Sequence, residues 1–98
     1  MSADFATQFQ QATAGNPDAQ FAVAEAYRRG SGVTVDLAKS VRWYRAAAAQ
    51  GHPMAQNDLG SMLLNGMGTE RSPEEAACWY RKAAEQGEAV AQFNLALR

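Results

Sequence analysis

Small and apolar residues recur along this chain at the spacing of an α-helix. In residues 37–50, Ser40, Tyr44 and Ala47 follow an i, i+4, i+7 pattern, and residues 73–86 repeat that pattern. Residues at this spacing share one face of a helix. The two segments are therefore predicted to be helices that each bury one face against a neighbour.

A second pair of helices is predicted at residues 17–29 and 53–65. Ala19, Val23 and Tyr27 form the apolar stripe of the first helix, and the second helix repeats the stripe with aliphatic residues. Each helix also carries a small residue beside its stripe, which lets the paired helix approach closely. The four segments together predict two antiparallel helical hairpins.

The predicted helix ends are marked by residues that favour capping or prevent helix continuation. Proline suits the first helical position, Ser and Asp suit N-caps, and glycine suits the left-handed conformation after a helix. The sequence of residues 72–75 also predicts a capping box. The residues concerned are Pro17, Pro53 and Pro73 at helix starts, Asp36 and Ser72 as N-caps, and Gly30, Gly51, Gly66 and Gly87 at helix ends.

The hairpins are two copies of one unit. An alignment of residues 15–50 with residues 51–86 needs no gap and contains 12 identities in 36 positions, where average composition gives roughly two or three by chance. A period of this length is typical of stacked helical repeats that offer a binding surface. The alanine-rich composition, with 47% apolar residues, also favours helices over strands.

We expect one domain, residues 1–98, made of stacked units. Residues 1–14 are interpreted as a degenerate second helix that caps the N-terminal end, followed by full units at 15–50 and 51–86. Residues 87–98 are interpreted as the first helix of a third, partial unit. Phe93 and Leu97 would then lie on an end without a polar cap, which predicts either a longer array or a homodimer through that end.

The sequence resembles a known repeat family. Trp-Tyr-Arg, two alanines and Gln-Gly recur at residues 43–51 and 79–87, after an Ala-Gln pair and a Gly-x-Gly in each unit. This combination is similar to the Sel1-like repeats, relatives of the tetratricopeptide repeats, and the resemblance covers residues 15–98. It implies an all-α fold, a right-handed α-α superhelix (solenoid) of antiparallel hairpins.

The resemblance also implies a function, because such arrays act as adaptors that hold other proteins. We expect a concave groove, lined by the first helix of each unit, to bind an extended peptide or a helix of a partner protein, or the chain to serve as a regulatory subunit. By the register of the repeat, the candidate groove residues are Asp18, Phe21, Glu25, Arg28, Arg29, Asn57, Ser61, Leu64, Asn65, Phe93 and Leu97.

Charge makes several other partners unfavourable. The formal net charge of -1 provides no strong field for nucleic acid or an anionic membrane. A chain with one cysteine, Cys78, cannot form an internal disulfide, which fits a reducing compartment. No leader or membrane-spanning run is recognised in the sequence. We therefore expect a cytoplasmic protein that binds neither nucleic acid nor membrane.

The sequence offers little catalytic chemistry. The single histidine, His52, precedes Pro53 and is interpreted as an N-cap or an exposed loop residue. Cys78 aligns with Arg42 and is expected to be partly exposed, but no base is evident that would activate it. Glu74 and Glu75 suit the first turn of a helix. We expect no enzyme activity, no cofactor and no metal site.

Overall fold

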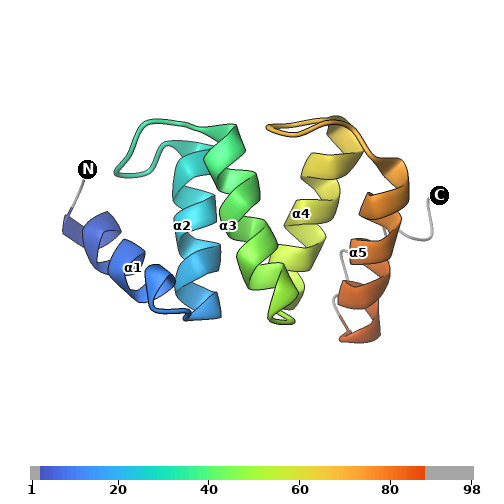
Figure 1. Cartoon of the computed structure of the whole chain (residues 1–98), viewed down its shortest axis with the longest axis horizontal. Helices are drawn as coiled ribbons and strands as arrows, with labels where there is room; N and C mark the ends of the chain where they lie inside the picture. The colour runs from blue at the N-terminus through green and yellow to red at the C-terminus, as the bar shows by residue number, and fades with distance from the viewer. Residues whose placement is uncertain (1–2, 88–98) are drawn as a thin grey trace.

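The structure is a computed structural model that describes residues 3–87. It contains five helices in this part of the chain: α1 (Ala3–Thr13), α2 (Pro17–Arg29), α3 (Leu37–Ala49), α4 (Pro53–Asn65) and α5 (Pro73–Glu85). The helices stand side by side in chain order, and each packs against the next (Figure 1). No strand occurs in this range. The all-α solenoid predicted from the sequence is therefore confirmed.

The helix starts agree with the predicted ones. Pro17, Pro53 and Pro73 occupy the first helical positions of α2, α4 and α5. The side chain of Asp36 accepts a hydrogen bond from the Lys39 N–H at 3.0 Å and so caps α3. These starts could be predicted because a cap and its partner lie within one turn of the chain.

Only one half of the predicted capping box forms. The Ser72 hydroxyl accepts the Glu75 N–H at 3.3 Å, but the Glu75 carboxylate does not return the bond. The Ser72 N–H instead donates to the carbonyl of Leu63 on α4 at 2.8 Å. The Glu75 carboxylate is thus available to contacts outside its own turn, and it accepts hydrogen bonds from Arg45 on α3 and from the indole of Trp79.

The glycines at helix ends act in two ways. Gly30 and Gly66 are the C-caps of α2 and α4 and have left-handed backbone angles. After α3, by contrast, the cap position is Gln50, and Gly51 follows it with a φ of 92°. The N–H of Gly51 donates to Ala48 O and the next N–H to Ala47 O. This is a Schellman motif, so the expected helix end was one residue too late.

Gly68 shows why a side chain is not tolerated in the loop between α4 and α5. A Cβ atom at this position would lie 2.4 Å from the carbonyl oxygen of Leu37, and its φ of +72° is also unfavourable for other residues. Leu37 begins α3. The loop of the second hairpin therefore rests on the start of α3, the helix that precedes this hairpin.

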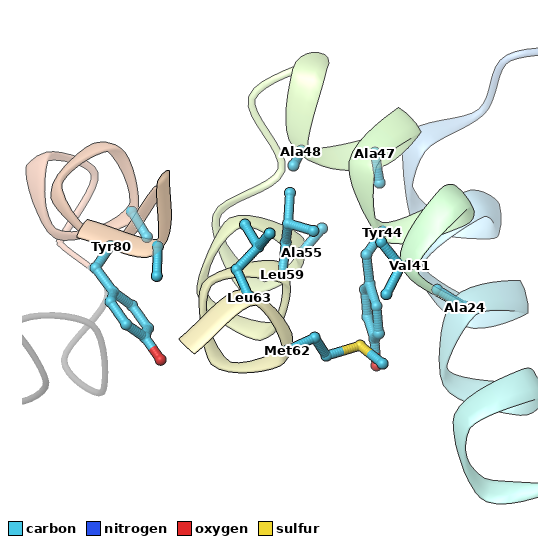
Figure 2. Close-up of a cluster of buried hydrophobic side chains, with 12 residues drawn as sticks. Ala24, Val41, Tyr44, Ala47, Ala48, Ala55, Leu59, Met62, Leu63 and Tyr80 are labelled. Carbon is cyan, nitrogen blue, oxygen red and sulfur yellow. The ribbon is translucent and has the colours of Figure 1, made fainter. Parts of the chain in front are cut away.

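The core lies in the planes between the helices. The predicted stripe on α3 is buried, and Tyr44 and its counterpart Tyr80 on α5 are 0% and 2% exposed. Figure 2 shows Tyr44 and Met62 pointing toward one another, while Tyr80 lies on the other side of α4. Trp43 is only partly buried, but it packs against both core clusters and stacks edge-on against Phe9 of α1, with ring centroids 5.5 Å apart.

Glutamines tie each hairpin to the preceding helix. The buried Gln56 on α4 donates through Nε2 to the Ala48 carbonyl of α3 at 3.1 Å, and its Oε1 accepts from Gln86 at 2.8 Å. Gln20 and Gln50 make the same arrangement one unit earlier, against the last turn of α1. These identical residues therefore hold the stack together, because Gln20 and Gln56 each donate a second hydrogen bond to a carbonyl oxygen in the last turn of the preceding helix, which already accepts the N–H of a glycine.

Candidate protein-binding groove

The structure places the groove candidates on two helices, α2 and α4. On α2, Asp18 and Arg29 are exposed, and Phe21, Glu25 and Arg28 are half-buried. On α4, Asn57 is buried, Ser61 and Leu64 are half-buried, and Asn65 is exposed. Phe93 and Leu97 lie outside the described residues. The described candidates thus range from exposed to buried, and only some could meet a partner directly.

Glu25 is the centre of a charged network on α2. Its Oε1 accepts hydrogen bonds from the Tyr44 hydroxyl at 2.6 Å and from Arg28 Nη2 at 3.0 Å, and its Oε2 pairs with Arg29 Nη2 at 2.9 Å. Arg28 Nε also donates to the Tyr44 hydroxyl at 2.9 Å. Tyr44 therefore receives one hydrogen bond and gives one, and it fixes both charged side chains to the core.

These contacts shift the ionisation of the groups involved. Burial opposes the charge on Glu25, but the hydrogen bonds from Tyr44 and Arg28 outweigh it, so the pKa of Glu25 lies below its ordinary value. Burial and then the hydrogen bond to Glu25 raise the pKa of Tyr44. At neutral pH the network is therefore an ionised carboxylate held by a guanidinium and a neutral phenol.

Asp58 of α4 belongs to the same cluster, although no pattern in the sequence indicates it. Burial, followed by its hydrogen bond with Glu25 and the negative charge of Glu25, raises the pKa of Asp58 to about 6. The two carboxyl groups therefore interact across the boundary between the units, and Asp58 is the one that holds its proton up to about pH 6. Asp58 aligns with Ala22, and nothing in the repeat pattern marks that position as polar.

A hollow of about 140 Å³ opens between α2 and α4 at this cluster. Arg28 of α2 lines one side, and Asp58, Ser61 and Met62 of α4 line the other, with Met67 from the following loop. Met67 is one of the exposed large apolar residues. The hollow thus offers an apolar wall beside a carboxyl group and a guanidinium, a composition that suits a mixed polar and apolar side chain.

Phe21 is partly covered by a residue that was not assigned to the groove. His52 stacks on its ring with centroids 4.7 Å apart and 17° between the planes. His52 Nδ1 accepts the Ala55 N–H as the N-cap of α4, and Nε2 lies 3.1 Å from Asp18 Oδ1. The N-cap interpretation of His52 is confirmed. The alternative of an exposed loop residue is wrong, because the side chain is only 12% exposed.

At the positions equivalent to Glu25, Arg28 and Arg29, α4 carries neutral side chains. Ser61 occupies the register of Glu25, and its hydroxyl lies 2.9 Å from the Tyr80 hydroxyl. Asn65 Nδ2 donates to the Ser61 carbonyl at 2.8 Å. Leu64 takes the place of Arg28 and packs against the core. The two units therefore share the tyrosine but differ in the groups around it.

Little else in the described range suggests bond-making chemistry. No group of three or more His, Cys, Asp or Glu side chains among these residues could hold a metal ion. Cys78 is exposed, as expected. None of the helices described here is long and apolar enough to span a membrane. The groove offers hydrogen-bonding, charged and aromatic groups, and these suit binding.

The comparisons with known proteins agree with this architecture. The sequence profile of the Sel1 repeat matches residues 17–52 and 53–88, most of the chain. The chain belongs to the Sel1 repeat family. Each match starts at the proline that begins α2 or α4, two residues after the unit boundary expected from the glycines. Sel1 repeat proteins form a non-catalytic scaffold family that generally acts in protein-protein interactions.

Solved structures of Sel1 repeat proteins superpose well on the chain. A Sel1 repeat protein from Oxalobacter formigenes has a TM-score of 0.89 and 36% identity, over 92% of this chain and 37% of that one. A protective antigen present in uropathogenic Escherichia coli strains, described as displaying an SLR fold, has a TM-score of 0.91 and 34% identity. That match covers 98% of this chain and 21% of the antigen. A comparison with curated proteins finds no match.

Proposed function

We propose that this Sel1 repeat chain is an adaptor module that binds a peptide or helix of another protein along the α2 and α4 face. The observation that carries the proposal is the arrangement around Tyr44, where Glu25 and Arg28 are held in fixed orientations at the surface. Such preorganisation reduces the entropy lost when a partner binds.

The difference between the units supports the same proposal. The tyrosine that packs the hairpin is kept, whereas its surface neighbours are charged on α2 and neutral on α4. If the chain served only as a structural scaffold, only the packing residues would need to recur in both units. A surface whose partly exposed side chains vary while its core repeats fits recognition of a partner with a defined sequence of charged and apolar side chains.

The proposal can be tested with a pair of substitutions that keeps the net charge. Asp18→Lys combined with Arg29→Glu exchanges the two exposed charges of α2. Partners captured by the wild-type chain are identified by mass spectrometry, purified and titrated by calorimetry. We expect the double substitution to weaken binding by about tenfold or more, because complementary charge is replaced by like charge at two positions.

The matched control exchanges two exposed charges on α5, with Glu74→Lys and Arg81→Glu, and should leave the affinity unchanged. Helical circular dichroism and thermal melting of both variants verify the fold. Equal binding by wild type and the α2 variant would contradict the proposed groove, and so would equal losses in the two variants.

A further inference from the structure

The hollow of about 140 Å³ between α2 and α4 contains a carboxyl group that has no cationic partner. Among residues 3–87, Asp58 forms no ion pair. Its hydrogen-bond partners are the carboxyl group of Glu25 and, at 3.4 Å, Nδ2 of Asn57. Glu25, by contrast, is paired with two arginines. Of the two neighbouring carboxyl groups, Asp58 is therefore the one whose charge is not balanced by a direct contact.

Arg28 lines the same hollow, but its donors are directed to other groups. Its Nε donates to the Tyr44 hydroxyl at 2.9 Å and its Nη2 to Glu25 at 3.0 Å, so it attracts Asp58 only through space. The remaining ionisable groups of this face bring no free positive charge, since Tyr44 is a neutral phenol and Arg29 pairs with Glu25. A cation supplied by a partner is therefore favourable beside an ionised Asp58.

The walls around Asp58 suit a long apolar stem that ends in such a cation. Met62 is buried and lines the inner part of the hollow, while Met67 is exposed and lines the outer part. Methionine side chains are flexible and polarisable, so they adapt to an aliphatic chain. The Ser61 hydroxyl, which lies 2.9 Å from that of Tyr80, keeps a lone pair for a further donor. The hollow thus combines an anionic group, a hydroxyl acceptor and two thioether side chains.

We infer that this hollow is a pocket for a lysine side chain of the partner polypeptide, with the ammonium at Asp58 and the stem along Met62 and Met67. The inference rests on the proposed function, because the pocket belongs to the same face, and it specifies one residue type in the partner. Lysine fits because its ammonium is a compact charge on a flexible stem. A carboxylate in the same place would be repelled by Asp58 and Glu25, and the guanidinium of an arginine would lie beside that of Arg28.

The pocket makes binding depend on pH, because the ammonium requires an ionised carboxylate. Burial and the neighbouring Glu25 raise the pKa of Asp58 to about 6, so about nine tenths of this group is ionised at pH 7 and about one tenth at pH 5. The proton and the ammonium therefore compete for the same group. We expect the affinity for a lysine side chain to fall about tenfold between pH 7 and pH 5.

The probe for the test is lysine blocked as its Nα-acetyl amide, and the neutral control is the corresponding norleucine amide, which has the same stem without the ammonium. Binding is followed by NMR of the full chain, isotope-labelled at the methyl groups of its four methionines. A ligand of this size should bind with a dissociation constant on the order of 1 to 10 mM. We expect saturable shifts of the Met62 and Met67 signals, whereas Met54, exposed on α4 outside the hollow, should not shift.

The norleucine amide should bind about tenfold or more weakly than the lysine amide, because it lacks the charge-assisted hydrogen bond to Asp58. Asp58→Asn keeps the size of the side chain and removes its charge. It should weaken binding of the lysine amide by about tenfold or more at pH 7 and abolish the dependence on pH. If this variant proves unstable, Asp58→Ala takes its place, since the first unit has alanine at that position.

The matched control is Glu74→Gln, which removes an exposed carboxylate of α5 outside the hollow and should leave binding unchanged. The methyl spectrum and thermal melting of each variant verify the fold. The pocket is overturned if the Met62 and Met67 signals do not shift saturably, if the two amides bind equally, or if removal of the Asp58 charge leaves lysine binding unchanged.

Failure of the pocket and failure of the proposed function give different results. If the lysine amide binds at Asp58 but the charge exchange on α2 leaves partner affinity unchanged, the cation site stands and the proposed groove is contradicted. If the charge exchange weakens partner binding but the lysine amide does not bind in the hollow, the groove stands and the lysine pocket is contradicted.

Discussion

At the scale of single residues, the most informative group is the carboxyl pair of Glu25 and Asp58. The two residues belong to different units, and their interaction shifts their pKa values in opposite directions. The pKa of Glu25 is lowered and that of Asp58 is raised to about 6. Arg28 and Arg29 pair with Glu25, so Asp58 is the carboxyl group of the pair that takes up a proton first as the pH falls. The contact between the two units therefore depends on the ionisation of Asp58.

The raised pKa of Asp58 predicts a loss of stability as the pH rises. Asp58 has an ordinary pKa of 3.8, so its contribution is present in full below about pH 4 and is lost as the pH rises through 6, because ionisation is easier in the unfolded chain. Glu25 has the opposite sign, but its contribution is complete above about pH 5. After a discount for solvent screening, we expect a loss of about 1 kcal/mol between pH 5 and pH 7.

Urea denaturation of wild type and Asp58→Asn at both pH values measures this effect. The other titrating groups are the same in both proteins and cancel in the comparison. The asparagine variant should gain about 1 kcal/mol relative to wild type between pH 5 and pH 7. A constant difference between the two proteins would show that Asp58 ionises normally in the fold.

At the scale of the helices and their connections, local sequence decides where each helix begins. Contacts with neighbouring helices decide which residues a connecting loop can contain. The helix starts depend on residues within one turn, such as Asp36 and Lys39. The capping box at Ser72 illustrates the limit. Its sequence is suitable, yet Glu75 instead accepts hydrogen bonds from Arg45 and Trp79, because a guanidinium from α3 lies within reach.

The loop glycine Gly68 provides a test at this scale. Gly68→Ala combines an unfavourable positive φ with a clash against the Leu37 carbonyl, which is backbone and cannot move aside easily. We expect it to lower the free energy of unfolding by about 2 to 4 kcal/mol. The measurement is urea denaturation of the variant and wild type.

Gly51→Ala is the matched control, since Gly51 has a φ of +92° but no atom within 4 Å of its added Cβ. It should cost only about 1 kcal/mol, the backbone part of the effect. Equal losses in the two variants would mean that the contact between the loop and α3 contributes nothing.

At the scale of the whole molecule, stability should vary along the stack. α3 and α4 each pack against a helix on both sides, whereas α1 packs against α2 and, through Phe9, against Trp43. Repeat proteins depend on such nearest-neighbour contacts. Opening of the stack is therefore expected to start at the α1 end in preference to its middle.

Native-state hydrogen exchange can measure this gradient. Amides in the middle turns of α3 and α4 should show an opening free energy equal to that of global unfolding. Amides of α1 should show a smaller opening free energy. Trp43→Ala should reduce the protection of α1 further, because that ring joins the two core clusters. Exchange of α1 at the global value would indicate that the stack unfolds as a single cooperative unit.

Much of this fold could be predicted from the sequence because the signals that specify the helices are local and recur in both units. The helix stripes, the prolines at helix starts and the register of 36 residues all concern neighbours in the chain or equivalent positions, and the structure agrees with them. The groove residues of α2 and α4 were chosen by the same register, and their role stays a prediction.

Tertiary structure alone decided which side chains meet across the units. Asp58 approaches Glu25, His52 covers Phe21, and Arg45 reaches Glu75, although each pair is about 30 residues apart in the chain. Such contacts depend on the angle and distance at which helices cross, which periodicity does not specify. Sequence thus determined the helices and their order, and packing determined the charges, the hollow and the surfaces that a partner can use.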